Sequence, residues 1–388
     1  MTEIIFDDLE DVKYFEADDT ARSHPKKEKT RLSTDNDEPI AESMLTYPAE
    51  NESVVYYTKE ITPESLDRIF NRLIVQSHFH DHRMVKISSG EPGGHNYLKP
   101  ELIGKLVQNI NGVICDTTTA YDGNRNTKDG QLKTMKDHGF CDIADVDVLD
   151  GDGEITRKVK DGYILPEVRI GSHVTDYNYH LILSHFKGHA MAGYGGALKG
   201  GALKNVCIGL ASKSGKSQIH TYGNSADLTV GFLDSYDQTL FQKAMVDASK
   251  TFIDYMKEHG PVVYINVANN LSVDCDCDAH AKPPCMEDLG IYASLDPVAV
   301  DQACIDAVYH AKDSQELIER IESKHGEKIL EFAEEKGLGS RKYHLVNIDQ
   351  NSIVESATFA QVKKIVDNIP KEEHHWFYHG DEFKNSPM

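Results

Sequence analysis

Long apolar runs are absent from this sequence of 388 residues. A membrane-spanning helix needs roughly 20 consecutive, mainly apolar residues, and no window approaches that length. The first residues, MTEIIFDDLEDVKYF, include acids where a signal peptide has basic residues and then an apolar stretch. We therefore expect a soluble, cytoplasmic protein that does not bind a membrane.

Basic charge is scarce as well. The chain has 41 Lys and Arg residues against 63 Asp and Glu residues, and its formal net charge is -22. Nucleic-acid binding needs a basic face, and the overall field of this chain repels polyanions. We therefore expect no nucleic-acid partner.

The seven cysteines form no C-x-x-C pair. Their odd number, in a chain without a visible signal peptide, argues against a disulfide framework. Four of them stand alone, which is typical of small buried hydrophobic residues: Cys115, Cys141, Cys207 and Cys304. The other three lie close together in the polar segment VANNLSVDCDCDAHAKPPCMEDLG.

Three segments differ in composition. Residues 1–52 form a polar, acidic extension, and residues 351–388 form a tail with one amphipathic helix and a polar end. Between them, in residues 53–350, strand-like and helix-like patterns alternate. This alternation predicts an α/β protein with a mainly parallel sheet flanked by helices, as one large unit or two intimately packed lobes. Ligands of such sheets usually bind at the carboxyl ends of the strands.

A candidate metal site follows the apolar strand PVVYINVA. Cys275 and Cys277 form a C-x-C pair whose thiolates can bind one soft metal ion or cluster. We consider Cys285, His280 and His220 as further ligands, and the flanking acids are also near. The alternative is an acidic surface loop whose thiols have no special role.

A glycine-rich segment, LSHFKGHAMAGYGGALKGGALKN, follows another buried strand pattern. Glycines let backbone N–H groups approach a ligand, and lysines attract anions. We predict acid–base or substrate-binding roles for His185, Lys187 and His189, with metal ligation as an alternative for the two histidines. The predicted anion-binding residues in this segment are Lys199, Lys204 and Asn205. The alternative is a flexible loop with solvated lysines.

Other loops add anion-binding candidates. GLASKSGKS is similar to a phosphate loop, but it has five residues where the Walker pattern has four, and it does not clearly lead into a helix. Lys213 and Lys216 remain candidates for contact with an anion. Two further strand-end loops contribute polar residues of the kind that an α/β active site needs: Glu91, His95, Asn96, Asp116 and Arg125.

Taken in order, several stretches resemble the domain-of-unknown-function 362 family, described as uncharacterised Fe–S centre proteins. They are VKISSGEPGGHNYLKPE, CDTTTAYDGNRNT, LKTMKDHGF, ILSHFKGHAMAGYGGALK, ASKSGKSQIH, INVANNLSVDCDCDAH, DLGIYASLDPVAVDQAC and AEEKGLGSRKY. The resemblance covers roughly residues 55–345. It implies an iron–sulfur association without a settled reaction, and the C-x-C pair matches the family whereas Cys285 does not.

Many relatives carry a ferredoxin-like insert after the stretch that corresponds to ASKSGKSQIH. Such an insert has repeated cysteines, whereas TYGNSADLTVGFLDSYDQ at this place has none. Any metal ion or iron–sulfur cluster must therefore use the few thiols named above, and zinc is a further possibility.

These observations predict a metal- or Fe–S-dependent enzyme that acts on a small anionic substrate. Two alternatives remain open at this point. The protein is a non-catalytic small-molecule or metal-binding protein, or it carries a purely structural zinc site, which would bind zinc without iron and unfold on chelation.

Overall fold

The computed structural model describes residues 53–77, 81–196, 204–226, 237–349 and 352–354. The predicted acidic extension, the helix expected after residue 350 and Lys199 lie outside the described residues. The proposed division into extension, core and tail therefore stays a prediction.

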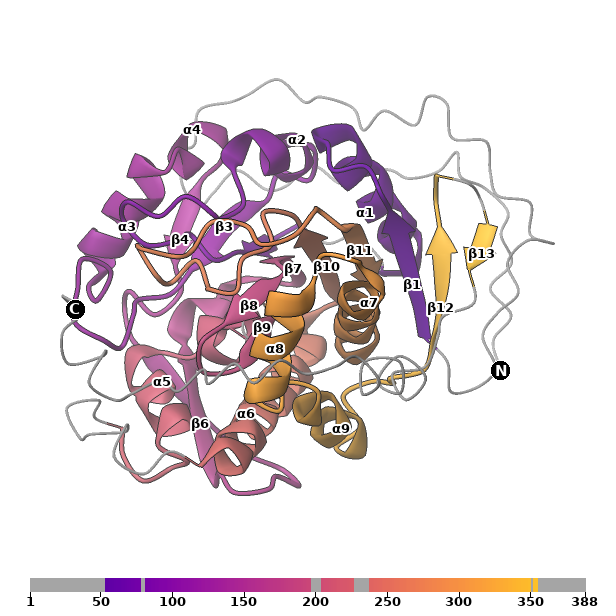
Figure 1. Ribbon diagram of the computed structural model, residues 1–388. Helices are drawn as coiled ribbons and strands as arrows, with labels where there is room; N and C mark the ends of the chain where they lie inside the picture. The colour runs from indigo at the N-terminus through magenta and orange to yellow at the C-terminus, as the bar shows by residue number, and fades with distance from the viewer. Residues whose placement is uncertain (1–52, 78–80, 197–203, 227–236, 350–351, 355–388) are drawn as a thin grey trace, which may run out of the picture. The chain divides into compact units, whose positions relative to one another are not determined.

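A single nine-stranded sheet forms the centre of the described part (Figure 1). Its strands are β1 (Ser53–Thr58), β2 (Arg83–Lys86), β3 (Val113–Asp116), β4 (Val146–Val148), β7 (Tyr179–His185), β10 (Val262–Ala268), β11 (Gly290–Ser294), β12 (Tyr343–Asn347) and β13 (Ser352–Val354). Their order is β13-β12-β1-β11-β10-β7-β2-β3-β4. The five strands β10-β7-β2-β3-β4 are parallel to one another, whereas β11 is antiparallel to both of its neighbours. The predicted α/β class with a mainly parallel sheet is confirmed.

The direction in which the chain adds parallel strands to the sheet reverses between β2 and β7. From β2 the chain moves outward to β3 and β4, and it then returns to add β7 and β10 on the other side of β2. Such a switch point leaves a crevice at the carboxyl ends of the two central strands, where α/β proteins usually bind ligands. The loops after β2, β3, β7 and β10 all start at this edge of the sheet.

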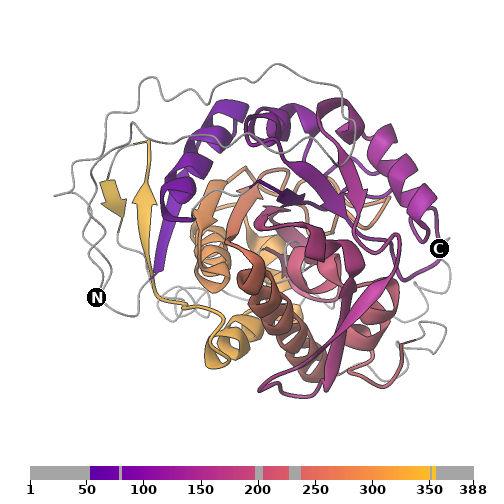
Figure 2. The ribbon, with the colours of Figure 1, turned by 180° about the vertical axis from the view of Figure 1, so that it is seen from behind.

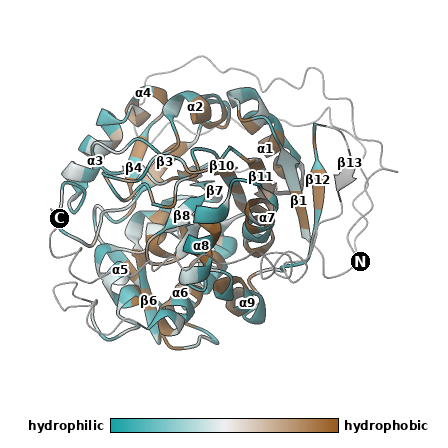
Figure 3. Ribbon diagram, viewed as in Figure 1, coloured by the Kyte–Doolittle hydropathy of each residue, from teal (hydrophilic) through white to brown (hydrophobic). Residues whose placement is uncertain are grey.

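Helices cover both faces of the sheet (Figures 1 and 2). One face carries α1 (Pro63–Ser77), α2 (Pro100–Asn109), α3 (Lys128–Asp137) and α4 (Phe140–Ile143). The other carries α5 (Lys213–His220), α6 (Gln238–His259) and α7 (Pro297–His310), followed by α8 (Gln315–Ser323) and α9 (Lys328–Glu335). Figure 3 shows hydrophobic and hydrophilic residues on α1, α2 and α6, as expected for amphipathic helices on a sheet.

Two hydrophobic clusters result from the alternation of side chains along each strand. Leu181 and Leu183 of β7 pack with residues of α1 and α2, whereas Ile182 packs with residues of α6 and α7. Every residue of β7 and β10 is buried. Burial on both faces explains why these strands read as continuous apolar runs in the sequence.

Smaller elements surround the main sheet. Two hairpins pair β5 (Glu154–Lys158) with β6 (Glu167–Gly171) and β8 (Lys187–His189) with β9 (Gly193–Gly195). Short helical turns span Ser172–Asp176 (η2) and Lys204–Ile208 (η3). In the described part of the chain, no helix combines the length and the apolar composition that crossing a membrane requires.

The segment GLASKSGKS corrects one expectation, because it does lead into a helix. Ser212 caps α5 by accepting a hydrogen bond from the backbone N–H of Gly215. The mismatch to the Walker spacing remains, so the segment is a capped helix start and not a phosphate loop of that kind.

A buried carboxylate in α7 gives the fold a pH-dependent element. Asp306 accepts hydrogen bonds from the Tyr343 hydroxyl at 2.7 Å and from the Gln302 amide at 2.9 Å. Burial raises the pKa of Asp306 to about 6 from an ordinary 3.8, although these hydrogen bonds and His310 and Arg341 oppose the rise. The folded state therefore binds the proton of the Asp306 carboxyl more tightly than the unfolded state does.

We predict that Asp306 stabilises the fold below about pH 4 and that this contribution is lost as the pH rises through about 6. The difference between the two pKa values corresponds to roughly 3 kcal/mol. Urea unfolding of the wild type and Asp306→Asn at pH 4 to 8 tests this, because the wild type should lose stability relative to the variant as the pH rises. A pH-independent difference between the two proteins would contradict the prediction.

Candidate metal centre

The loop after β10 carries the C-x-C pair at the carboxyl edge of the sheet. Its sequence alternates acids and thiols as Asp274, Cys275, Asp276, Cys277 and Asp278. Cys275 is buried and Cys277 is half-buried. The first two acids are bound to other parts of the protein, so their role is to hold the loop.

The Asp276 carboxylate lies fully buried between the side chains of His185 and Lys187. Its Oδ1 accepts a hydrogen bond from His185 Nδ1 at 2.9 Å, and its Oδ2 pairs with the Lys187 ammonium. Burial by itself would raise the pKa of Asp276, but His185 and Lys187 outweigh it and hold the pKa below its ordinary value. The predicted acid–base residues His185 and Lys187 therefore both bind the carboxylate of Asp276, the residue between the two cysteines.

Asp274 is anchored on the other side of the pair. Its carboxylate lies 3.3 Å from Arg320 Nη1 of α8 and accepts the backbone N–H of Lys282 at 3.1 Å. The loop after β2 adds a further contact, since the Glu91 N–H donates to the Asp276 carbonyl at 2.9 Å. Three segments distant in sequence therefore fix the backbone around Cys275 and Cys277.

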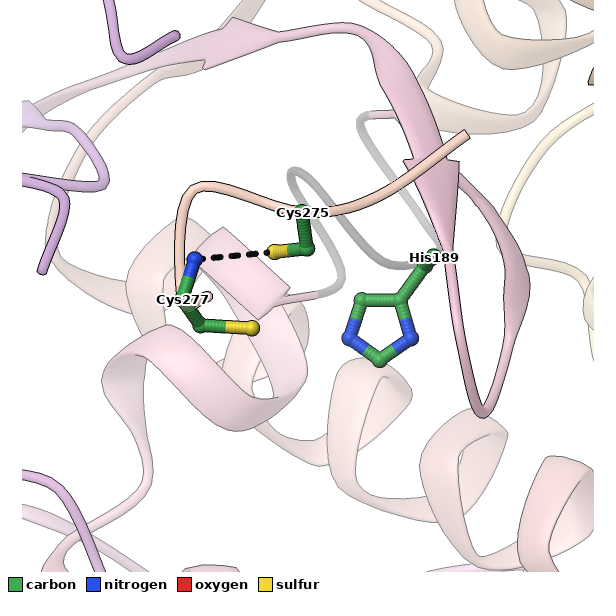
Figure 4. A group of neighbouring side chains, drawn as sticks. All are labelled: His189, Cys275 and Cys277. Carbon is green, nitrogen blue, oxygen red and sulfur yellow. Dashed lines mark hydrogen bonds between the residues drawn. The ribbon is translucent and has the colours of Figure 1, made fainter. Parts of the chain in front are cut away.

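The β8–β9 hairpin places a histidine beside the two thiols (Figure 4). Gly188 of β8 donates its N–H to Ser272 O at 2.7 Å. A Cβ atom at Gly188 would lie 2.3 Å from Val273 O, so the hairpin can lie this close to the cysteine loop only with glycine. The next residue, His189, offers a ring nitrogen that lies with both cysteine sulfurs in one group, each atom within 4.8 Å of the others.

One backbone hydrogen bond in this group is directed at a sulfur, and two others fix the His189 ring. The backbone N–H of Cys277 donates to Cys275 Sγ at 3.4 Å. His189 Nδ1 accepts the N–H groups of Met191 and Ala192, both at 3.1 Å. In Figure 4 one ring nitrogen faces the thiols and the other faces the hairpin. N–H groups directed at sulfur stabilise negative charge on it, which metal binding requires.

The other three predicted metal ligands lie outside this group. The Cys285 thiol donates to Leu271 O at 3.3 Å, and burial raises its pKa. His280 is exposed, and His220 on α5 donates Nδ1–H to Lys216 O at 2.7 Å. The one group of potential metal ligands among the described residues contains none of them, and their ligand role stays a prediction. The sequence indicated His189 as an acid–base residue or a metal ligand, but it did not show that this histidine lies beside the two thiols.

A second polar cluster lies at the carboxyl ends of β2, β3 and β7. Asp116 is buried, with Lys86 Nζ 2.9 Å from its Oδ1 and the Ser89 N–H 2.9 Å from its Oδ2. Although burial would raise it, the pKa of Asp116 is held well below its ordinary range by Lys86 and Arg125. Arg125 also donates from Nε to Glu91 Oε1 at 2.9 Å.

Asn205 closes this cluster from the side of β7. Its amide donates to Leu183 O at 3.2 Å and to Ser184 Oγ at 3.1 Å, while Lys86 Nζ lies 3.4 Å from its Oδ1. Four predicted anion-binding residues thus come together at the switch point: Glu91, Asp116, Arg125 and Asn205. The sequence missed Lys86, although a lysine within an apolar strand is a signal, because lysine is almost never fully buried without a partner.

The remaining anion-binding candidates are more scattered. Lys216 is buried, donates to Thr117 Oγ1 at 2.7 Å and has its pKa lowered to about 8 by burial. Lys213 lines a nearby pocket of about 350 Å³ together with Thr118 and Ser212. His95 is exposed, and Asn96 donates to Lys282 O at 3.1 Å. Lys204 begins η3, but its side chain lies outside the described part.

Comparison with known proteins places the chain in a family. The family described as "Domain of unknown function (DUF362)" matches residues 84–306, which is more than half of the chain. The chain belongs to this family. The matched residues include the C-x-C pair, the β8–β9 hairpin and the cluster around Asp116, so both polar sites of this DUF362 protein lie within the family domain. No curated protein matches the sequence.

Two solved structures are distantly similar. One is the lactate racemase apoprotein from Thermoanaerobacterium thermosaccharolyticum, at 14% identity over 56% of this chain, with a TM-score of 0.32. The other is a protein from Thermotoga maritima, at 12% identity over 72% of this chain and 60% of its own, with a TM-score of 0.37. The chain spans about half of the racemase, 51% of its length.

Proposed function

We propose that this DUF362 protein holds a soft metal ion or small cluster through Cys275 and Cys277 and uses it to act on a small anionic substrate. The observation that carries the proposal is that the Cys275 and Cys277 sulfurs lie within 4.8 Å of each other at the carboxyl edge of the sheet, with His189 of a separate element beside them. The candidate centre lies beside the switch point of the sheet, where ligands of α/β proteins usually bind.

The donor set fits a metal of this kind. Thiolates suit zinc, Cu(I) and iron in iron–sulfur clusters, and carboxylate-rich sites suit harder ions such as magnesium. The nearest carboxylates, of Asp274 and Asp276, are already paired with Arg320, His185 and Lys187. A bound metal would supply Lewis-acid or redox chemistry, and a site with fewer than four protein ligands keeps a position open for substrate.

The anionic substrate is proposed from the cations at the same edge of the sheet. Lys86, Arg125 and Lys216 are buried there, with Asp116 and Glu91 as the paired acids. A lysine whose pKa is about 8 can also transfer a proton near neutral pH. These features favour a small acid over a neutral substrate.

We expect the Cys275→Ser, Cys277→Ser double variant to lose its bound metal and the associated visible or charge-transfer absorption. Serine does not replace a thiolate as a ligand for a soft metal. The measurement is element analysis and a spectrum of protein purified without oxygen. Cys285→Ser is the matched control, because it removes a half-buried thiol of the same loop that lies outside the group.

Unchanged metal content and spectrum in the double variant would refute the proposed centre. Iron with a broad charge-transfer band would favour a cluster, and zinc alone a single ion. Metal binding together with stabilisation by small carboxylates or phosphate, but without turnover of candidate substrates, would favour the non-catalytic alternative.

A further inference from the structure

The position of the proton on the neutral His189 ring decides whether the nitrogen beside the thiols can donate a hydrogen bond or bind a metal. A neutral imidazole has one N–H and one lone-pair nitrogen. His189 Nδ1 receives two backbone N–H groups, from Met191 and Ala192, each at 3.1 Å. A nitrogen that accepts from two donors must be the one with the lone pair. The proton of the neutral ring is therefore on Nε2, which is the nitrogen that faces the thiols in Figure 4.

A histidine that binds a metal shows the opposite arrangement. Its free ring nitrogen carries the proton and donates it to a carboxylate, a carbonyl or water, which leaves the lone pair of the other nitrogen for the metal. For His189 to bind a metal through Nε2 in this way, a proton would have to move to Nδ1, where it would oppose the N–H groups of Met191 and Ala192. Both hydrogen bonds would be lost.

His185 provides the contrast within the same site. Both of its ring nitrogens face acceptors, the carboxylate of Asp276 at 2.9 Å and the carbonyl of Asn269 at 2.5 Å. The ring nitrogens of His185 therefore face hydrogen-bond acceptors, whereas His189 Nδ1 faces two hydrogen-bond donors. The two histidines are separated by only three residues, but they have different tasks.

The hairpin makes the His189 arrangement rigid. The ring accepts from residues two and three positions further along the chain, within the turn that joins β8 to β9. That turn ends at Gly193, whose φ of +90° suits glycine. On its other side the hairpin is fixed to the cysteine loop by the close contact of Gly188 with Ser272 and Val273. Rotation of the ring would break this local network.

We infer that His189 is a hydrogen-bond donor to the Cys275 and Cys277 thiolates through Nε2–H and is not a metal ligand. Together with the Cys277 N–H on Cys275 Sγ, it surrounds the sulfurs with donors. This inference rests on the proposed function where it concerns the metal. It then follows that, within this group of described residues, the two thiolates are the metal ligands.

The test is the tautomer of His189, read by nitrogen-15 NMR on histidine-labelled protein, with His189→Gln to assign the signal. We expect the Nε2–H tautomer in the metal-free protein and again after addition of Zn²⁺. An Nδ1–H tautomer in either form would overturn the inference.

Zinc binding adds a second readout. We expect His189→Gln to keep its bound zinc with an affinity lowered by about 10- to 100-fold, the usual effect of losing a hydrogen-bonding partner of a metal ligand. His259→Gln, which changes an exposed histidine at the end of α6, is the control and should leave the affinity unchanged. Complete loss of zinc in His189→Gln alone would contradict the inference. A wild-type protein that binds no metal would instead refute the proposed function, and the tautomer of the metal-free protein would still decide the role of His189.

Discussion

Replacing Asp276 by alanine is expected to lower the free energy of unfolding by about 3–5 kcal/mol. The carboxylate and the side chains of its partners His185 and Lys187 are at most 1% exposed. Removing it would leave the Lys187 ammonium buried without its counter-charge and His185 Nδ1 without its acceptor, which costs far more than the loss of an exposed ion pair. Urea unfolding monitored by circular dichroism measures the change.

Asp278→Ala is the matched control, because this acid of the same loop is exposed and its Oδ1 accepts a local N–H, that of His280. We expect its effect to stay within about 0.5 kcal/mol. The Asp276 variant should also retain metal less well than the control, since the carboxylate holds the backbone between Cys275 and Cys277. A loss of stability as small as that of the control would show that the buried network does not anchor the loop.

The roles of the acids could not be predicted from the sequence. The segment DCDCD predicts the two thiols as metal ligands and leaves the neighbouring carboxylates as further candidates, because all are potential ligands in one short loop. The structure separates them by their partners, and those partners are remote, with His185 and Lys187 lying 91 and 89 residues before Asp276 in the chain. Loop geometry of this kind depends on long-range contacts that local patterns do not contain.

The elements of the fold were predictable to a greater extent. The apolar runs of β7 and β10 are local patterns that predict strands, and the structure has strands at both places. The strand order is not a local property, so the switch point between β2 and β7 could not be read from the sequence. The expected gathering of polar loops at the carboxyl edge did follow from the α/β alternation, and it brings Asp116, Glu91 and Arg125 together.

The second large predicted loss of stability concerns Asp116, in the polar cluster at that switch point. Asp116→Ala is expected to lower the free energy of unfolding by about 3–5 kcal/mol, because Lys86 is fully buried and would lose the carboxylate that lies 2.9 Å from its ammonium. The pKa of Asp116 is lowered in the folded state, so its contribution is present above the ordinary carboxyl pKa and is lost as the pH falls. The wild type should therefore lose its advantage over the variant in acid, which urea unfolding between pH 2 and 7 would show.

A double variant, Lys86→Met with Asp116→Leu, distinguishes an uncompensated charge from a simple loss of packing. Replacing both members of a buried ion pair by apolar residues of similar size is often neutral, whereas removing one member leaves the other buried alone. We therefore expect the double variant to be more stable than Asp116→Ala, with Arg125 still paired to Glu91. If the double variant is no more stable than the single one, the polar cluster contributes mainly through shape and hydrogen bonds, and the charge of Lys86 is not what makes Asp116 necessary.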